Sequence, residues 1–237
     1  MLYYKTDDSN VIERVILMVS QLNRRQLLGS AALATAALSV SAGSSAFAQG
    51  AAPKSDGTVD MAKLLEAGKL EDKVLGKADA PVTIVEYASM TCSHCADFTN
   101  NTLPKIKEKY IDSGKARLIF REFPFDPRAT AAFMLARCAP DDRYFPMVDV
   151  LFKQQMQWAA AEDAQAALLQ ISKLAGFTQE SFNACLTNQQ LLDDVNSVRD
   201  RGAEFGVNAT PTFFINGKKY SGALSVDQMS AVIDGLL

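Results

Sequence analysis

The chain has 237 residues, of which 48% are hydrophobic and 22% are charged, as in a globular protein that buries a sizeable core. Its formal charge at pH 7 is -3, and this balance does not indicate a nucleic-acid partner. The chain contains four cysteines, two of which are separated by only two residues. That spacing is typical of a redox site or a metal site, so these two cysteines are the first candidates for functional residues.

The first 48 residues have the pattern of a cleaved export signal. The sequence N-R-R-Q-L-L at 23–28 opens a run of Ala, Leu, Ser and Gly, and A-F-A at 46–48 matches the small-x-small pattern of a signal peptidase site. The paired arginines also resemble a twin-arginine signal, so the sequence leaves the export route open. These features predict that the protein is exported.

A transmembrane anchor is the alternative interpretation of this N-terminal region. Residues 27–48 are nearly long enough to span a membrane, but their many Ser, Gly and Thr residues favour cleavage. Acidic residues ahead of Met18 are unusual before a signal, which makes Met18 a more usual start than Met1.

Residues 49–73 are expected to form a flexible lead into the folded domain. Residues 49–58 are rich in Ala, Gly, Pro, Ser and Asp, a composition typical of loops and linkers. Residues 60–68 carry Met61 and Leu64 at helical spacing and are able to form one short helix.

A buried strand is predicted over 82–87, directly before the sequence T-C-S-H-C-A at 91–96. The strand reads V-T-I-V-E-Y, which is rich in β-branched and aromatic residues. Apolar residues then recur at helical spacing over 96–110, and Pro104 is expected to kink or split that helix. Cys92 is therefore placed where a strand ends and a helix begins.

Two thiols one helical turn apart at such a junction form a redox site. Free amides and the positive end of the helix dipole favour a thiolate, which lowers the pKa of Cys92. Cys95 is placed to resolve a mixed disulfide, and His94, the only histidine of the chain, is expected to tune both thiols. A zinc site is the alternative, but it needs four ligands, and Cys138 and Cys185 each lie alone far along the sequence.

A second strand is predicted over 116–123, where apolar and polar residues alternate and strand-forming residue types are frequent. With the strand over 82–87 and the helix between them, it forms a right-handed βαβ unit. Asp126 then serves as an N-cap, with Pro127 at the first helical position.

A helical insertion is predicted over 126–205, with four or five helices and no strand. Trp158 and Phe182 are expected in its core. In an exported protein, Cys138 and Cys185 most simply form a structural disulfide, and two buried free thiols are the alternative.

The C-terminal region returns to strands. Asn-Gly at 216–217 lies between two strand-forming runs and predicts a hairpin, and S-V-D-Q at 225–228 is a capping box for a last helix. A ββα ending after a βαβ beginning is the architecture of an α/β thioredoxin fold. The predicted segments are 1–48, 49–73, 74–125, 126–205 and 206–237.

Three pieces of this sequence resemble DsbA-like thiol:disulfide oxidoreductases of the thioredoxin-fold superfamily. They are V-L-G-K-A-D-A-P-V-T-I-V-E-Y, C-S-H-C and G-V-N-A-T-P-T-F-F-I-N-G, and the resemblance runs from about Val74 to the C-terminus. In the family these pieces are the first core strand, the redox motif and a loop that holds a cis-proline. The dipeptide here is Ser93-His94, where the best-known members have Pro-His.

The resemblance also assigns roles outside the redox motif. Glu86 would lie beneath the disulfide and help to move the proton of Cys95, because a buried acid is costly unless it has a task. A glutamate at a sheet edge or facing solvent is the alternative. Thr210-Pro211 would be a cis bond that faces the disulfide, and the backbone of Thr210 would pair with an extended substrate peptide.

The function implied by the resemblance is periplasmic thiol oxidation. The Cys92-Cys95 disulfide would be donated to exported, folding proteins and restored by a DsbB-like, quinone-linked membrane partner. A monomer without metal or organic cofactor is expected. An isomerase or reductase kept reduced by a membrane donor is one alternative, although residues 49–80 are too few for the dimerisation domain of such isomerases. A copper module built on Cys92, His94 and Cys95 is the other.

Overall fold

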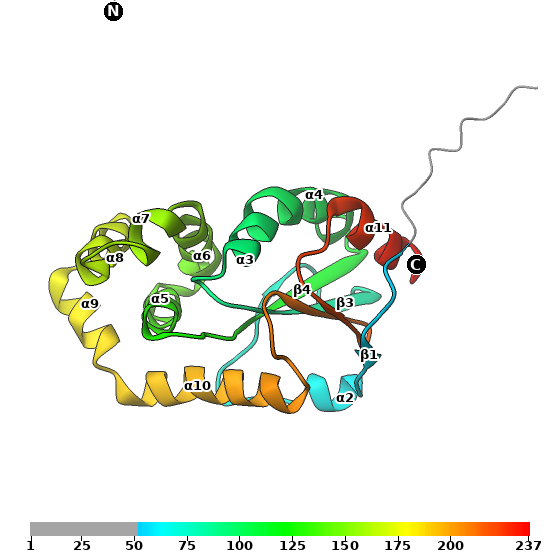
Figure 1. Ribbon diagram of the computed structural model, residues 1–237, viewed down its shortest axis with the longest axis horizontal. Helices are drawn as coiled ribbons and strands as arrows, with labels where there is room; N and C mark the ends of the chain where they lie inside the picture. Colours follow the sequence, from blue (N-terminus) through cyan, green and yellow to red (C-terminus); the bar gives the residue numbers. More distant parts are fainter. Residues whose placement is uncertain (1–51) are drawn as a thin grey trace, which may run out of the picture. The chain divides into compact units, whose positions relative to one another are not determined.

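The computed structural model describes residues 52–237 and centres on a six-stranded mixed sheet (Figure 1). The strand order is β1-β6-β5-β3-β4-β2, in which β3 and β4 run parallel and all other neighbours run antiparallel. The predicted signal over 1–48 lies outside the described residues. The strands are β1 (Gly57–Thr58), β2 (Lys73–Leu75), β3 (Val82–Ala88), β4 (Ala116–Glu122), β5 (Thr212–Ile215) and β6 (Lys218–Ser221).

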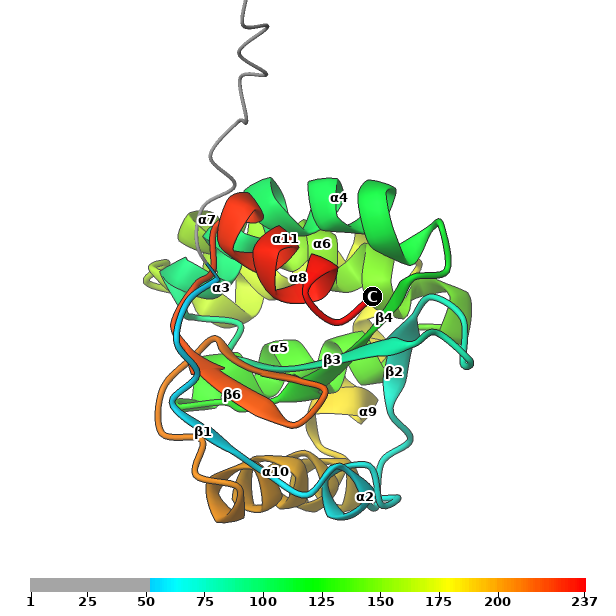
Figure 2. The same cartoon turned by 90° about the vertical axis from the view of Figure 1, so that its right-hand side faces the viewer.

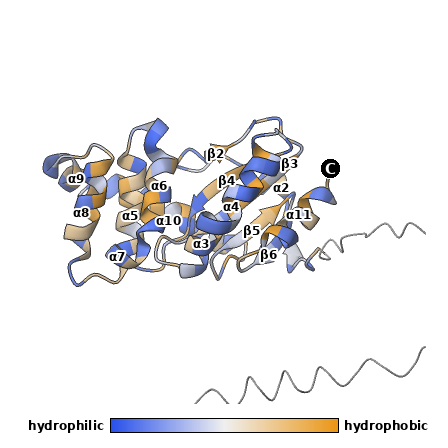
Figure 3. Cartoon of the chain, turned by 90° about the horizontal axis from the view of Figure 1, so that it is seen from above, coloured by the Kyte–Doolittle hydropathy of each residue, from blue (hydrophilic) through white to orange (hydrophobic). Residues whose placement is uncertain are grey.

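Strand β3 lies inside the sheet, between β5 and β4, and it is buried along its whole length. Its alternate residues serve two different cores, since successive side chains of a strand point to opposite faces. Val82 and Ile84 pack with the helices on one face, and Val85 and Tyr87 pack on the other. Figure 3 shows hydrophobic colour along the neighbouring strands β4 and β5. A strand covered on both faces explains why apolar residues occur on both sides of it in the sequence.

The first face of the sheet is covered by the helical region that follows the redox motif and by α11 (Val226–Asp234) (Figure 2). That region comprises α3 (Ser93–Asp97), a π-helical turn (Phe98–Thr102), α4 (Leu103–Ile106) and a second π-helical turn (Lys107–Ile111). The predicted break is present, because Pro104 lacks an amide proton and lies in the first turn of α4. The predicted capping box of α11 is confirmed.

The second face is covered by α2 (Met61–Leu64) and α10 (Gln189–Glu204) (Figures 1 and 2). The approach of α10 is close at Gly202, where an added Cβ would lie 2.7 Å from a ring carbon of Tyr87. A larger residue would push α10 away from β3. The α2 helix lies within the short helix that the sequence allows over 60–68.

Two short edge strands were not expected from the sequence. The composition of residues 49–58 predicts flexibility, whereas β1 hydrogen-bonds along β6 from Asp56 to Val59. Strand β2 pairs with β4 at the opposite edge. Two or three residues are too few to display an alternating pattern, and these strands depend on the sheet edge for their hydrogen bonds. The predicted hairpin is confirmed, with positive φ at both Asn216 and Gly217.

The helical insertion between β4 and β5 contains six α-helices, more than the four or five predicted. The extra helix arises at Gln154, where α6 gives way to α7 without a Gly or Pro that would mark the break. Trp158 and Phe182 are fully buried, as predicted.

None of the helices within residues 52–237 has the length and apolar character of a membrane span. The remaining helices are α5 (Pro127–Cys138), α6 (Tyr144–Lys153), α7 (Gln155–Ala159), α8 (Ala164–Leu174) and α9 (Gln179–Leu186), with a 3₁₀ turn (Asp141–Arg143) before α6.

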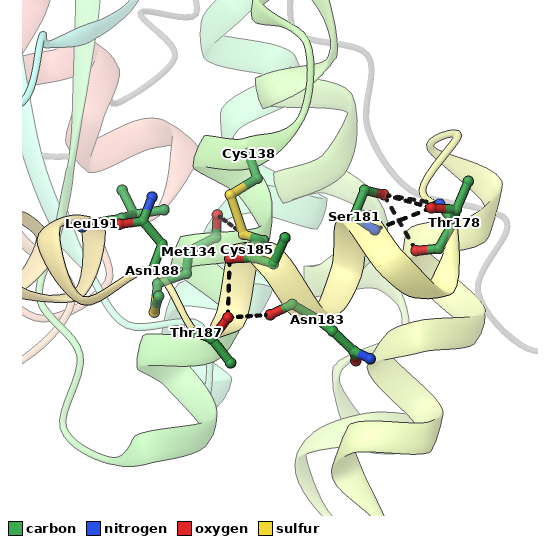
Figure 4. The surroundings of a disulfide bond; sticks show 10 residues. Met134, Cys138, Thr178, Ser181, Asn183, Cys185, Thr187, Asn188 and Leu191 are labelled. Atoms are coloured by element: carbon green, nitrogen blue, oxygen red, sulfur yellow. Dashed lines mark hydrogen bonds between the residues drawn. A yellow bond between two sulfur atoms is a disulfide. The ribbon is translucent and has the colours of Figure 1, made fainter.

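A disulfide joins Cys138, the last residue of α5, to Cys185 in α9 (Figure 4). The two Cα atoms are 6.1 Å apart, and Cys185 is buried in the core of the insertion. At its other end α9 begins with a capping box between Thr178 and Ser181, which Figure 4 shows away from the disulfide. The short helix α9 is thus held at both ends.

Candidate active site

Cys92 lies between β3, which ends at Ala88, and α3, which begins at Ser93. It is the N-cap of α3, in an extended conformation, and its carbonyl oxygen accepts the amide of Ala96 at 3.1 Å. The helix begins at Ser93, three residues before the predicted range. The half-buried thiol of Cys92 donates a hydrogen bond to the carbonyl oxygen of Thr210 at 3.2 Å.

The surroundings of Cys92 favour its thiolate. They lower its pKa from 9.0 to about 5, with the hydrogen bond from the Cys95 thiol as the largest cause and the backbone amides of His94 and Cys95 in support. Partial burial acts in the opposite direction. An extended N-cap directs the sulfur at the free amides of the helix, which explains why these donors reach it.

Cys95 has the opposite environment. It is fully buried in the core shared with the helical insertion. Burial, the hydrogen bond to Cys92 and the charge of Glu86 raise its pKa far above the ordinary value of a thiol. The structure contains both residues as free thiols, so one half-buried, acidic thiol and one buried, weakly acidic thiol lie one helical turn apart.

Glu86 is fully buried on β3, and neither of its carboxylate oxygens has a hydrogen-bond partner. It lies two residues after Ile84 and therefore on the face that carries α3. Burial, followed by the negative charge of Cys92, raises its pKa from 4.5 to about 8. The alternative of a solvent-facing glutamate is wrong, because the strand is covered on both faces. A carboxyl group with this pKa exchanges protons near neutral pH.

Ser93 and His94 are both exposed on the first turn of α3. The contribution of His94 to the lowered pKa of Cys92 comes through its backbone amide. Any residue in the first turn of a helix would supply an amide in this way. The lowered pKa of Cys92 therefore depends on the position of the helix as well as on the Cys95 thiol.

The loop before β5 closes the other side of the site. The Thr210-Pro211 bond is cis, and the carbonyl of Thr210 is the acceptor of the Cys92 thiol. Both loop residues are buried. The structure thus brings together Cys92, Cys95, Glu86 and the Thr210-Pro211 loop, which are separated in sequence by as many as 125 residues. Cys138 and Cys185 form their own disulfide within the insertion.

Comparisons with known proteins agree with this geometry. The family model described as Thioredoxin matches residues 69–235. The chain belongs to the thioredoxin family. Among its similar solved structures is Wolbachia pipientis alpha-DsbA1, at 36% identity and a TM-score of 0.67, with 73% of this chain and 94% of that chain covered. The predicted membership of the DsbA-like proteins and the predicted fold are both confirmed.

Relatives in sequence carry similar names. A Rickettsia bellii protein provisionally named a protein-disulfide oxidoreductase is 34% identical over 69% of this chain. The match spans 63% of the length of that relative. A Bacillus anthracis protein, named as a probable disulfide bond formation protein D, is 32% identical over 60% of this chain and 69% of its own length.

Two residues of this DsbA-like site could not be identified from the sequence. Asp126 was recognised as the N-cap of α5, and its Oδ1 does accept the amides of Arg128 and Ala129. Its Oδ2 also accepts the hydroxyl of Thr91 at 2.6 Å. Gln155 donates to the backbone carbonyls of Met90 and Cys92. A glutamine in a Gln-rich stretch gives no pattern from which this contact could be found.

An open groove of about 570 Å³ lies between α3 and the insertion in this DsbA-like protein. It is lined from the redox motif by Thr91 and Ser93 and from the insertion by Asp126, Gln155 and Met156, among others. The side chain of Met156 is 74% exposed. Thr91 and Ser93 in the lining of this groove are the two sequence neighbours of Cys92.

A metal centre is not indicated in the part of the chain that the structure describes. Within residues 52–237, no group of three or more His, Cys, Asp or Glu side chains is arranged to hold a metal ion. Cys95 is buried while His94 is exposed, so the three residues of the copper hypothesis face different surroundings.

Proposed function

We propose that this protein is a periplasmic thiol:disulfide oxidoreductase that donates the Cys92-Cys95 disulfide to exported, folding proteins. The contrast between the two thiols is the observation that carries the proposal. The stabilised thiolate of Cys92 exists only in the reduced form, so it shifts the equilibrium between disulfide and dithiol towards the dithiol. A disulfide whose reduced form is stabilised is a strong oxidant.

The first chemical step is attack by a substrate thiolate on the sulfur of Cys92. The bond between Cys92 and Cys95 breaks, a mixed disulfide forms through Cys92, and Cys95 leaves with the electron pair. Glu86, which is mostly protonated near neutral pH, supplies the proton that neutralises Cys95. Without that proton, the negative charge on Cys95 would remain buried beside the core.

The second step releases the product. A second thiolate of the substrate attacks the substrate sulfur of the mixed disulfide, and Cys92 leaves as a thiolate. Its low pKa makes it a good leaving group. The substrate has lost two electrons and gained a disulfide, and Cys92 and Cys95 now hold the two electrons.

The substrate chain lies in extended form along the Thr210-Pro211 loop, where the backbone of Thr210 pairs with it. Re-oxidation of the two cysteines falls to a DsbB-like membrane oxidant. All groups named in these steps come from one chain, so a monomer is sufficient. Cell fractionation of the full chain tests whether it is exported to the periplasm.

The experiment that tests the function is refolding of a protein with several disulfides, started once from the reduced state and once from the scrambled state. We expect rapid oxidation from the reduced state and little rescue from the scrambled state. Efficient rescue of the scrambled protein with slow oxidation of the reduced one would favour the isomerase. In parallel, Cys95→Ala should abolish oxidation of the reduced protein, since the Cys92-Cys95 disulfide that starts the reaction can no longer form.

A further inference from the structure

Gln155 connects the helical insertion to the backbone of the redox site. It is the first residue of α7 and is 5% exposed in the folded chain. Its Nε2 atom donates to the carbonyl oxygen of Met90 at 2.8 Å and to that of Cys92 at 3.0 Å. Both protons of the amide are used, so the side chain is held in one orientation by the site.

The carbonyl of Cys92 also accepts the amide of Ala96 and thereby starts helix α3. Gln155 therefore holds the peptide group at which the helix begins. Thr91, between the two contacted carbonyls, is held from the same direction by Asp126. The insertion thus contacts three consecutive residues that end at the reactive cysteine, through the backbone of Met90 and Cys92 and through the hydroxyl of Thr91.

We propose that Gln155 is a positioning residue, whose carboxamide fixes the backbone of Cys92 so that the thiolate stays directed at the amides of α3. This inference rests on the proposed function for its relevance to turnover, although the geometry itself does not. It makes the insertion part of the redox site, since a helix 63 residues further along the chain sets the direction of the sulfur.

The reduced and oxidised forms depend differently on this contact. In the disulfide, the covalent bond to Cys95 holds the sulfur of Cys92 in place. In the dithiol, only non-covalent contacts direct the thiolate at the amides of His94 and Cys95. Loss of the Gln155 contact should therefore disfavour the reduced form more than the disulfide, and weaken the protein as an oxidant.

The test replaces the amide with an apolar side chain of similar length, Gln155→Met. The matched control is Gln157→Met, which makes the same change at an exposed position of α7. Titration of thiolate absorbance should show the pKa of Cys92 raised by about one pH unit in Gln155→Met. The equilibrium with glutathione should move about tenfold towards the disulfide, which lowers the reduction potential by about 30 mV. The control should change neither quantity.

A structural role alone would lower the free energy of unfolding without moving the pKa or the potential. Gln155→Asn, whose amide is too short to reach both carbonyls, should give a smaller shift in the same direction and serves if Gln155→Met does not fold. A folded variant with the pKa and potential of the wild type would overturn the inference. Failure of the wild type to oxidise dithiols would instead contradict the proposed function and leave the pKa comparison interpretable.

Discussion

Glu86→Gln should make the protein more stable, and increasingly so as the pH rises. The folded pKa of Glu86 is about 8 and its ordinary value is 4.5, so between these values the folded protein keeps a proton that the unfolded chain releases. Stability therefore falls as the pH rises through this window. At 1.36 kcal/mol per pKa unit, the penalty is about 3 kcal/mol at pH 7 and about 5 kcal/mol above pH 8. Glutamine, which does not ionise, removes it.

The assay is denaturant unfolding of the protein with Cys92 and Cys95 reduced, at about pH 4, 7 and 9. The variant and the wild type should be equally stable at the lowest pH and diverge at the others. Glu122→Gln is the control, because Glu122 is equally buried but accepts hydrogen bonds from Arg137 and Tyr144. It should destabilise by about 3 kcal/mol or more, since the buried Arg137 loses its anionic partner. A Glu86→Gln effect that is the same at every pH would refute the argument.

Three further changes test separate parts of the structure. Cys95→Ala should raise the pKa of Cys92 above about 5, because it removes the hydrogen bond that contributes most to the lowered pKa. Thiolate titration measures this pKa, and an unchanged value would show that the helix amides are sufficient. Serine at both Cys138 and Cys185 should cost up to about 4 kcal/mol of stability, given a loop of 47 residues, without slowing dithiol oxidation; a comparable loss of activity would contradict a purely structural role. Gly202→Ala should destabilise by about 1–3 kcal/mol, because the new methyl group would lie 2.7 Å from an aromatic ring carbon of β3; thermal unfolding at wild-type stability would disprove the close packing.

The fold could be predicted where local sequence decides local structure. The strand before the site, the hairpin at Asn216 and the last helix each have a pattern that needs no distant partner. The break between α6 and α7 at Gln154 has no such signal, because packing in the insertion ends the first helix. Edge strands β1 and β2 are specified mainly by the strands that they pair with.

The residues of the candidate site likewise fall into those that local sequence predicts and those that it does not. Cys92 and Cys95 were found from their spacing, and the burial of Glu86 was suggested by its apolar neighbours. Asp126 and Gln155 were missed as site residues, since their contacts join segments separated by 35 and 63 residues. Only the fold brings these polar side chains to the backbone of the redox motif.

The reduction potential of the Cys92-Cys95 pair tests the central claim most directly. It is measured by equilibrating the protein with glutathione buffers and quantifying the reduced fraction. A stabilised Cys92 thiolate predicts an oxidising pair, with a potential less negative than about −180 mV. A potential near about −270 mV, as in a reductant of the thioredoxin kind, would contradict the assignment of this protein as an oxidase.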